Sequence, residues 1–487
     1  QVFYIQSEIP DNNPKTSEAI KVYSPEPIAI EVGDKVQLVA TVYEETNHIE
    51  NGLTSTSLRD IQNFKIIKTG LDLPKATIIG RSGRKIPKKY FSTYNGDLNF
   101  KPSLNLKDGL DFWESLEGMR VSLSNPKIVG FRGGKEQSDD YKTHLTLFLE
   151  PDGNLRGARS TGAGGLQAEP EDHIFNPHII PLASGPMTKG LNINASYKMG
   201  DIINGKLTGI VVFTKNLFGD GEYLFLLPQE QETLSRFNSS ISNRILSNIS
   251  ERPKAKYDRE QLSIAAYNVK NLSPVNKKRI KETALMIKEN LNCPDVLGLV
   301  EVQDNNGEDF DGDSQADNTL DKLIENIPCP FAYKEANIDP LVHREGGVPG
   351  GNIRVSLIFN QEKLIFKENP LPGPEVETLL KPNGSLNYNP GRIFPNAQAF
   401  RNTRKSLIVE FEYKAKKLFV VVNHFNSKLS DTSHFSSIWP MVYPSEVKRS
   451  QMADAVNTFV GRIANRDPKA LIAVVGDFNE FIDMPAM

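Results

Sequence analysis

The sequence predicts a mixed α/β protein in which mostly-β modules precede a layered α/β domain. In the first half, short alternating segments are separated by Gly, Asp, Asn and Pro, which is typical of closely spaced strands. A polar stretch rich in Ser and Asn follows, as in a linker. From Leu262 onwards, apolar runs of strand length alternate with segments of helical periodicity. We therefore expect two β modules at 1–112 and 113–230, a linker at 231–259 and an α/β domain at 260–487.

The composition is that of a globular protein. Of the 487 residues, 38% are hydrophobic and 24% are charged, which is enough apolar surface to bury a core. The net charge of −3 excludes a globally basic nucleic-acid binder, although local Arg and Lys side chains can still hold phosphate. No apolar stretch approaches the ~20 residues of a membrane span. No leader pattern opens the chain, so we expect a cytosolic protein or a form that has lost its leader.

The chain contains two cysteines, Cys293 and Cys329. This number excludes a disulfide-dense scaffold and a Cys-rich zinc site. The two cysteines could pair with each other across one strand–helix unit. The interpretation that we favour is a pair of ordinary buried thiols, because unpaired cysteines are among the most buried residues in proteins.

Alternation of apolar and polar residues predicts the strands of the first half. The segment "IEVGDKVQLVATVYEE" alternates and carries a Gly-Asp turn, and later stretches behave in the same way. These stretches are 117–131, 141–153 and 199–228. Strands of this kind are typical of small barrels or sandwiches. The run "RKIPKKYFSTY" interleaves basic and aromatic residues, as single-stranded nucleic acid would require, but we favour a loop.

In the second half, strands and helices alternate. Apolar residues recur every three or four positions in three expected helices, at 277–290, 318–327 and 445–464. Ser445 is the expected N-cap of the last helix. The expected strands are 262–269, 295–302, 352–360, 405–413, 417–425 and 470–478. The second of these strands is almost continuously apolar, which indicates burial on both faces.

Polar residues stand at the ends of four of these strands. They are Asn268, Glu301, His424 and the pair Asp477 and Asn479. Each has an ordinary explanation when taken alone: a loop carboxylate, an Asx turn or a core histidine. Open α/β sheets, however, form their sites at strand ends. A carboxylate for a hard cation, a second to orient water, an amide and an imidazole together suit metal-assisted attack on a phosphodiester.

Several motifs occur in order along the chain, including "AAYNVKNL", "DVLGLVEVQDN", "GGNIRVSLIFN", "NPGRIFP", "VVVNHFNSK" and "VVGDFNEF". They resemble the motifs of the endonuclease/exonuclease/phosphatase superfamily. The resemblance is greatest to large extracellular nucleases with an oligonucleotide-binding-like (OB-like) β region, which "LEGMRVSL" also resembles. It implies a four-layer αββα catalytic domain behind OB-like modules, and a secreted protein. We expect it to act as a monomer.

The resemblance implies roles for the residues that bind metal and phosphate. Glu301 matches the metal ligand of the family, and Asn268 matches the residue that contacts both phosphate and the metal shell. Arg354 corresponds to an arginine that meets substrate phosphate, where a planar fork can hold two oxygens. Lys428 is a weaker candidate for phosphate contact. Arg404 could line the groove, but an ordinary surface arginine explains it equally well.

The resemblance also implies the residues of the chemical step. His424 belongs to the acid/base machinery, Asp477 orients the attacking water, and Asn479 holds the phosphorus. Together with Mg²⁺ or Mn²⁺, these residues would make a nuclease that hydrolyses DNA, and RNA as an alternative, with little sequence specificity. Two other functions stay open. One is the same fold acting on a phosphomonoester or a phospholipid, and the other is a catalytically dead nucleic-acid-binding protein.

A second cation site is conceivable in "DNNGEDFDGDSQADNT". Asp309, Asp311 and Asp313 alternate around Gly312, and spaced carboxylates in a turn suit Ca²⁺. The stretch lacks the Gly and terminal Glu of an EF-hand. We therefore favour an acidic, solvated loop.

The chain departs from the family pattern at its end. In the family, further strands and a closing Ser-Asp-His motif follow the G-D-x-N motif, and no counterpart precedes Met487. His434 lies in a nearby loop and does not replace the missing histidine. We expect a fragment of a longer enzyme with little or no activity of its own, an uncovered sheet edge, and a first β module that is incomplete at Gln1. A natural pseudoenzyme is the alternative.

Overall fold

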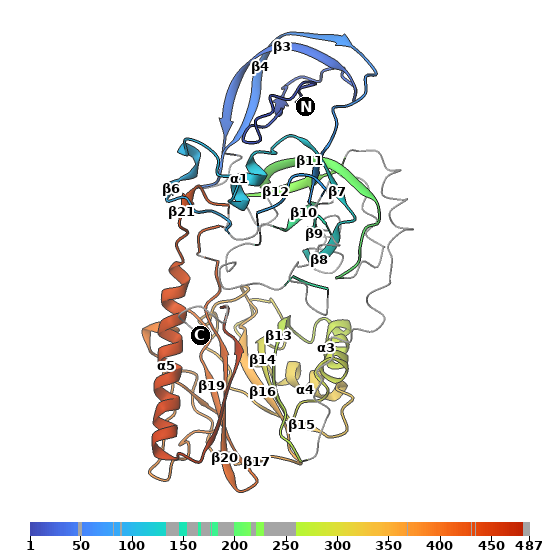
Figure 1. Cartoon of the computed structure of the whole chain (residues 1–487). Coiled ribbons are helices and arrows are strands. Elements are labelled where there is room, and N and C mark those ends of the chain that lie inside the picture. The colour runs from blue at the N-terminus through green and yellow to red at the C-terminus, as the bar shows by residue number, and fades with distance from the viewer. Residues whose placement is uncertain are drawn as a thin grey trace. The chain divides into compact units, whose positions relative to one another are not determined.

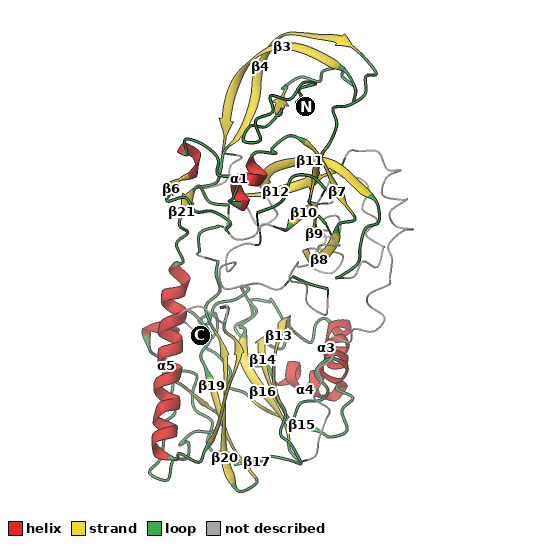
Figure 2. Ribbon diagram, in the orientation of Figure 1, coloured by secondary structure: helices red, strands yellow, loops and turns green. Residues whose placement is uncertain are grey.

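The computed structural model describes residues 1–46, 51–80, 82–87, 90–132, 146–152, 164–166, 176, 178–183, 199–215, 221–227, 260–367, 369–429, 431–433 and 435–480. The chain forms two compact units, one of Gln1–Ser250 with Thr432–Val442 and one of Glu251–Asp431 with Tyr443–Met487. Strands predominate and helices accompany them, so the predicted mixed α/β class is confirmed (Figures 1 and 2). The expected linker at 231–259 lies outside the described residues. None of the described helices has both the length and the apolar character that a membrane span requires.

The first unit begins with a four-stranded sheet of order β1-β2-β4-β3. The strands are β1 (Val2–Gln6), β2 (Ala19–Tyr23), β3 (Lys35–Glu45) and β4 (Ser55–Lys68). β3 and β4 form a long antiparallel hairpin with shifts in register, and β2 pairs with β4 in parallel. The predicted strand at 30–45 is therefore confirmed, whereas an OB-like barrel stays a prediction.

A seven-stranded sheet of order β5-β7-β11-β12-β10-β9-β8 follows. The strands are β5 (Thr77–Ile79), β7 (Arg120–Ser124), β8 (Lys127–Arg132), β9 (Thr146–Glu150), β10 (Ile180–Ala183), β11 (Lys206–Lys215) and β12 (Gly221–Leu226). Its strands bury Val121, Leu149 and Val211 completely. The first sheet ends at Lys68 and the second begins at Thr77. The strands therefore divide well before residue 112, where we expected the boundary between the β modules.

A segment from the second half of the chain, Thr432–Val442, belongs to the first unit. Its strand β21 (Ile438–Trp439) pairs antiparallel with β6 (Gly96–Asp97). Phe435 packs edge-on against Phe91 and Tyr223, with ring centroids 5.4 and 5.8 Å apart. Nothing in the local sequence pattern predicts this excursion, because its apolar residues find partners only through long-range contacts.

The second unit contains two sheets, of orders β13-β14-β16-β15 and β17-β19-β20-β22, and β18 pairs with β19. The strands are β13 (Ile264–Leu272), β14 (Val296–Val302), β15 (Tyr333–Ala336), β16 (Arg354–Asn360), β17 (Ile365–Phe366), β18 (Gly391–Arg392), β19 (Leu407–Tyr413), β20 (Lys416–His424) and β22 (Leu471–Asp477). The helices are α3 (Lys277–Glu289), α4 (Asp317–Asn326) and α5 (Pro444–Arg466). Every strand and helix predicted from Leu262 onwards is present. The short strands β15, β17 and β18 were not predicted.

Three apolar cores hold the second unit together. Successive residues of a strand point to opposite faces of its sheet. Val300 of β14 and Val420 of β20 therefore pack in a core between the two sheets. Leu299 packs with α3 and α4 on the other face of the first sheet, and Phe419 packs with α5 on the other face of the second. The strand β14 is buried on both faces, as its continuous apolar run predicts.

The predicted N-cap of the last helix is wrong. α5 begins at Pro444, and Tyr443 occupies the N-cap position. Proline suits the first helical turn because its missing N–H would have no partner in the helix. Ser445 lies inside that turn and donates from its N–H and its hydroxyl to Asp431, over 2.9 and 2.6 Å.

The favoured interpretation of the cysteines is also wrong. Cys293 and Cys329 form a disulfide with their Cα atoms 5.8 Å apart. The bond joins the turn after α3 to the segment after α4, beside the core under both helices. The sequence left this pairing open because two thiols brought together by a fold and two separate buried thiols have the same local pattern.

We predict that removing this disulfide destabilises the second unit. The bond closes a segment of 36 residues, and restraining the unfolded chain over that length corresponds to about 4 kcal/mol. The double variant Cys293→Ser/Cys329→Ser should therefore unfold at lower urea concentration than the wild type. Dithiothreitol should shift the wild type toward the variant and leave the variant unchanged. Equal urea midpoints would contradict the prediction.

A buried carboxyl group in the first unit should make its stability depend on pH. Glu114 ends α1 (Gly109–Glu114) and accepts a hydrogen bond from the hydroxyl of Tyr223. Burial raises the pKa of Glu114 to about 7, and nearby Asp111 and Glu44 also raise it. Because the folded state binds this proton more tightly than the unfolded state, the contribution of Glu114 to stability is largest at low pH. It falls as the pH rises toward 7.

We predict that Glu114→Gln stabilises the protein at pH 8 and has little effect at pH 5. The amide keeps the shape of the protonated acid and never ionises. Thermal unfolding of the variant and the wild type at both pH values tests this. Exposed Glu8→Gln is the matched control, because Glu8 is about half exposed and pairs only with Lys35 at the surface. A Glu114→Gln variant less stable than the wild type at pH 8 would contradict the prediction.

Candidate functional site

The candidate site lies where strands of both sheets of the second unit end. β13 and β14 run parallel, with Asn268 opposite Val300, and β20 and β22 run parallel, with His424 opposite Asp477. Parallel pairing places the carboxyl ends of neighbouring strands at the same edge of a sheet. Residues that are up to 209 positions apart in the sequence therefore come within hydrogen-bond distance.

The amide of Asn268 connects the two carboxylates of the site. Its Nδ2 donates to Glu301 Oε1 over 3.0 Å and to Asp477 Oδ2 over 2.9 Å. Its Oδ1 accepts the N–H of Lys270 over 2.8 Å, which fixes the direction of the side chain. The structure thus brings together three of the predicted residues: Asn268 of β13, Glu301 of β14 and Asp477 of β22.

Two local backbone features aim the carboxylates. Glu301 has a φ of +63°, and the pairing of β14 with β16 shifts register around it. A bulge of this kind redirects one side chain at the end of a strand, and positive φ in a glutamate is a strained state that clusters at functional sites. Gly476 has a φ of +140°, and a Cβ there would lie 2.0 Å from the carbonyl oxygen of Asn423. Only glycine lets β22 approach β20 this closely, directly before Asp477.

The segment after β22 is fixed against the segment after β20. The N–H of Phe425 donates to the carbonyl of Asp477 over 2.9 Å. Asn479 donates from Nδ2 to the carbonyl of Phe425 over 3.0 Å, and from its N–H to Asp477 Oδ1 over 2.9 Å. Asn479 is therefore held beside Asp477, as the motif predicts.

His424 completes the group. It is 5% exposed, and its Nε2 lies 3.9 Å from Glu301 Oε1. Its buried Nδ1 has no hydrogen-bond partner among the residues that the structure describes. Burial and, to a smaller extent, the charge of Arg404 lower the pKa of His424 to about 3, although Asp477 acts in the opposite direction. The imidazole is therefore neutral at neutral pH.

Arg404 belongs to this group, although the sequence did not separate it from an ordinary surface arginine. Arg404 is 8% exposed, and its guanidinium donates to the carbonyl of Phe425 over 2.9 Å. Burial lowers the pKa of Arg404, whereas the negative charges of Glu301 and Asp477 raise it. The only signal in the sequence is the position of Arg404 three residues before β19. That position does not show in which direction the side chain points.

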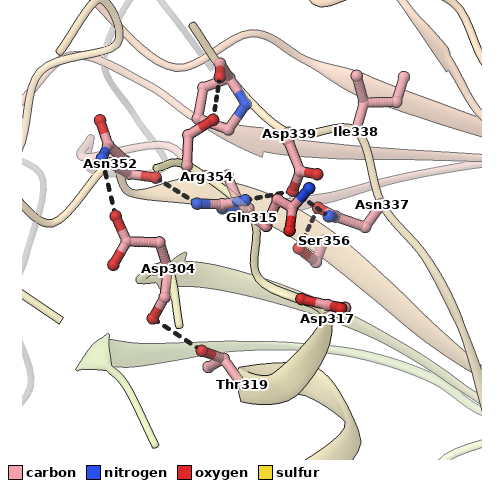
Figure 3. A network of polar contacts seen from close by, with 12 residues as sticks. Asp304, Gln315, Asp317, Thr319, Asn337, Ile338, Asp339, Asn352, Arg354 and Ser356 are labelled. Carbon is pink, nitrogen blue, oxygen red and sulfur yellow. Dashed lines mark hydrogen bonds and ion pairs between the residues drawn. The ribbon is translucent and has the colours of Figure 1, made fainter. Parts of the chain in front are cut away.

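Arg354 is buried and paired within the protein, and its predicted contact with substrate phosphate stays a prediction. Its side chain is 0% exposed and forms an ion pair with Asp339. Its Nη2 donates to the carbonyl of Asn352 over 2.9 Å. Figure 3 shows the guanidinium between these two partners, next to the contact of Asn352 with Asp304. The guanidinium beside the Asn268 group is that of Arg404.

Lys428 also has a protein partner. Its ammonium group pairs with Glu480, the residue after Asn479, and is 36% exposed. Both residues line a pocket of about 480 Å³ whose other walls come from 266–268 and 476–479. Asn268 and Asp477 line this pocket, as do Tyr267 and Phe478, whose side chains also pack against the cores beside α3 and α5. Phosphate contact by Lys428 stays a prediction.

The donor set fits a magnesium ion that is shared with substrate. Mg²⁺ commonly takes one or two protein carboxylates and keeps water or phosphate at its other positions. Glu301 could supply such a half-site, whereas Asn268, whose Oδ1 accepts the N–H of Lys270, would have to turn its amide over to add an oxygen ligand. Within the described part of the chain, no three His, Cys, Asp or Glu side chains gather as a metal cage. A closed structural metal site is therefore a poorer fit than an open catalytic one.

The acidic loop shows hydrogen bonds of an ordinary turn. Asp311 Oδ1 accepts the N–H of Asp313, and Asp313 Oδ1 accepts the N–H of Gln315, each over 2.9 Å. Asp311 also accepts from the amide of Asn306. These contacts favour the acidic-loop interpretation, and Ca²⁺ at Asp309, Asp311 and Asp313 stays a prediction.

Comparisons with known proteins find a family model and several solved structures. Residues 78–230 match the family model of a domain of unknown function, DUF8508, and this range nearly coincides with the seven-stranded sheet. No curated protein matches the sequence. Solved structures match about half of the chain, as the following three show.

Humanized TDP2 of D. rerio is 16% identical over 45% of this chain and 63% of its own, with a TM-score of 0.27. The human Nocturnin catalytic domain is 14% identical over 48% and 69%, with a TM-score of 0.28. A hairpin deletion mutant of beta toxin from Staphylococcus aureus is 16% identical over 46% and 70%, with a TM-score of 0.26. The chain thus spans less than two thirds of the TDP2 structure. TM-scores this low carry no argument about its function.

We predict that Arg404→Met raises the pKa of His424 in the metal-free protein. The substitution removes a nearby positive charge and leaves Asp477 in place, so the protonated imidazole becomes less unfavourable. An NMR titration of the histidine ring protons, with His424→Asn for assignment, measures the shift. Arg404→Lys keeps the charge and is the matched control. An unchanged or lower pKa in Arg404→Met would contradict the prediction.

Proposed function

We propose that the second unit is a metal-dependent phosphodiesterase domain with the four-layer αββα architecture of the endonuclease/exonuclease/phosphatase superfamily. One observation carries the proposal. The Asn268 amide bridges Glu301 and Asp477, and His424 and Arg404 lie beside them at the ends of separate strands. Chance surface polarity does not bury an arginine and a histidine next to two carboxylates, because each buried charge is costly unless it is paired.

Each residue has a chemical task in this proposal. Glu301 and Asn268 would hold a divalent cation, which when bound neutralises charge on the phosphate oxygens. The carboxylate of Asp477 accepts a hydrogen bond from the attacking water and orients it. Arg404 places a buried positive charge beside the phosphate, where a low dielectric strengthens the attraction. Asn479 donates to the developing negative charge.

His424 enters the reaction as a neutral imidazole. A pKa of about 3 leaves it unprotonated at neutral pH, so it can accept a proton but cannot donate one. A bound phosphate would add negative charge to that of Asp477 and raise the pKa of His424, whereas a divalent cation at Glu301 would lower it. The acid/base role is thus coupled to occupancy of the site.

Nucleic acid is the proposed substrate, DNA first and RNA second. The pocket of about 480 Å³ is lined by Asn268, Lys428 and Asp477, which are polar groups suited to a phosphodiester. Polar groups that meet phosphate carry no sequence information. Low sequence specificity follows. A phosphomonoester or a phospholipid headgroup is the alternative substrate.

A second candidate function, binding of nucleic acid without hydrolysis, has one specific observation in its favour. On the first sheet, Arg59 lies over the rings of Tyr23 and Tyr43, at 5.0 and 5.8 Å from their centroids. Both tyrosines are more than a third exposed. Glu45 pairs with Arg59 at 2.7 Å and weakens the positive charge that a nucleic-acid surface requires, so we rank this function second.

We also propose that the protein is secreted. Disulfides persist in oxidising compartments and are rare in the cytosol. The Cys293–Cys329 bond supports an extracellular site of action.

The deciding test of the proposed function is metal binding, followed by cleavage. Mn²⁺ binding to the 487-residue chain, measured by electron paramagnetic resonance, should weaken at least about 10-fold in Glu301→Gln. With the protein in excess over supercoiled plasmid, slow nicking should require Mg²⁺ and stop with EDTA. His424→Asn should keep Mn²⁺ binding and lower the nicking rate by about 100-fold or more.

Glu282→Gln is the matched control, because Glu282 lies exposed on α3 and pairs only with Lys278. It should change neither metal binding nor nicking. Mn²⁺ binding that is absent, or that Glu301→Gln leaves unchanged, contradicts a catalytic metal site. Metal-dependent hydrolysis of sphingomyelin or an inositol phosphate without plasmid nicking contradicts nucleic acid as the substrate.

A further inference from the structure

A buried arginine on α5 contacts the segment that carries the predicted catalytic residues. Arg449 Nε donates to Glu480 Oε2 over 2.7 Å, and Arg449 Nη2 lies 2.6 Å from the same oxygen as an ion pair. Both side chains are 0% exposed. A buried ion pair gives up the hydration of both charges, so it is weak evidence for stability by itself. This pair therefore requires an explanation other than stability.

The ion pair connects the two loops of the site. Glu480 belongs to the segment after β22. Its Oε1 accepts a hydrogen bond from the ammonium group of Lys428, which belongs to the segment after β20. Arg449 Nη1 also reaches the carbonyl of Asn426 in that segment, over 3.4 Å. The Arg449 guanidinium thus contacts both segments, which lie far apart in the sequence.

The same guanidinium fixes the beginning of its own helix. Arg449 Nη1 donates to the hydroxyl of Ser445, and Nη2 lies 3.6 Å from Asp431. Ser445 in turn donates to Asp431. These contacts hold the helix end from which Arg449 projects, so the direction of the guanidinium is defined on both sides.

We propose that Arg449 and Glu480 are positioning residues for Asp477 and Asn479. This inference rests on the proposed function. Neither residue belongs to the Asn268 group, and the pair acts through the three residues 477–479 that precede Glu480. A planar guanidinium fixes the orientation of a carboxylate better than an ammonium group or an apolar contact does. The pair therefore sets where the Asp477 carboxylate and the Asn479 amide stand relative to His424.

The test compares the double variant Arg449→Met/Glu480→Met with the wild type. Replacing a buried ion pair by apolar residues of similar volume often preserves stability, so the variant can fold while losing directional contacts. The control is Lys363→Met/Asp295→Asn. It removes a comparably buried pair, 10% and 0% exposed, next to the first residue of β14 and thus at the opposite ends of the strands. If the double variant does not fold, Glu480→Gln is used in its place.

Three measurements are made on each protein: hydrogen exchange of the amides at 476–480, the Mn²⁺ dissociation constant, and the rate constant for bis(p-nitrophenyl) phosphate hydrolysis. We expect exchange to accelerate at 476–480 in the double variant and not in the control. The turnover number should fall by about 10- to 100-fold, because small misplacement of catalytic groups has effects of this size. The Mn²⁺ dissociation constant of the double variant should stay within about 3-fold of the wild-type value. The single variant Arg449→Lys should keep part of the rate that the double variant loses.

Exchange at 476–480 and a turnover number equal to those of the control would overturn the inference. So would a parallel loss of Mn²⁺ binding and turnover, since that pattern indicates a general structural role. If the wild type neither binds Mn²⁺ nor hydrolyses the diester, the proposed function fails. Exchange at 476–480 then decides the positioning role alone: acceleration in the double variant supports it and equality with the control refutes it.

Discussion

The face-to-face packing of the two sheets in the second unit is the constraint on which the site depends. Gly298 shows how close that packing is, because a Cβ there would lie 3.0 Å from the side chain of Val422. With the sheets in contact through a core that includes Val300 and Val420, the ends of β14 and β20 cannot move apart independently. Glu301 is the last but one residue of β14, and His424 is the last residue of β20. Their separation of 3.9 Å is thus set by apolar packing, and the polar contacts then adjust it.

Buried charge is the second organising feature. In the described part of the unit, the cations Arg354, Arg392, Arg404 and Arg449 are all nearly or fully buried. Three of them have a carboxylate partner: Arg354 pairs with Asp339, Arg392 with Glu345, and Arg449 with Glu480. Arg404 differs, because it donates to a backbone carbonyl and feels the site carboxylates only through space. A guanidinium without a carboxylate of its own remains able to attract a ligand anion, which is why we propose Arg404 for the contact with phosphate.

The sequence predicted the elements of the second unit well, because each is specified by a local period. The apolar run at Val296–Val302 and the helical spacing of Ile280, Ala284 and Ile287 determine their own conformations. The grouping of Asn268, Glu301 and Asp477 also follows from strand-end position.

The directions of the arginine side chains could not be predicted in this way. Arg354 and Arg404 stand at or shortly before the beginning of a strand. The direction of each guanidinium depends on a partner that is distant in the sequence, Asp339 for Arg354 and the carbonyl of Phe425 for Arg404. Arg449 occupies the apolar stripe of α5 with Met452 and Val456, and that misplaced charge was the available signal for it. The excursion of Thr432–Val442 had no local signal, because its partners belong to the other unit.

Under the proposed function, the charges of the site suit a divalent cation and a phosphodiester taken together. Glu301 and Asp477 are two carboxylates beside one guanidinium, that of Arg404, while His424 is neutral at neutral pH. The group is therefore negative by one charge and repels a phosphodiester, which itself carries one negative charge. A divalent ion reverses this sign, so that the diester then meets a group with a single positive charge. Binding of the anion should thus depend on prior or simultaneous binding of the cation. Asn268 is the residue that makes the arrangement tolerable before the ion arrives, because its amide donates to both carboxylates and lowers their mutual repulsion.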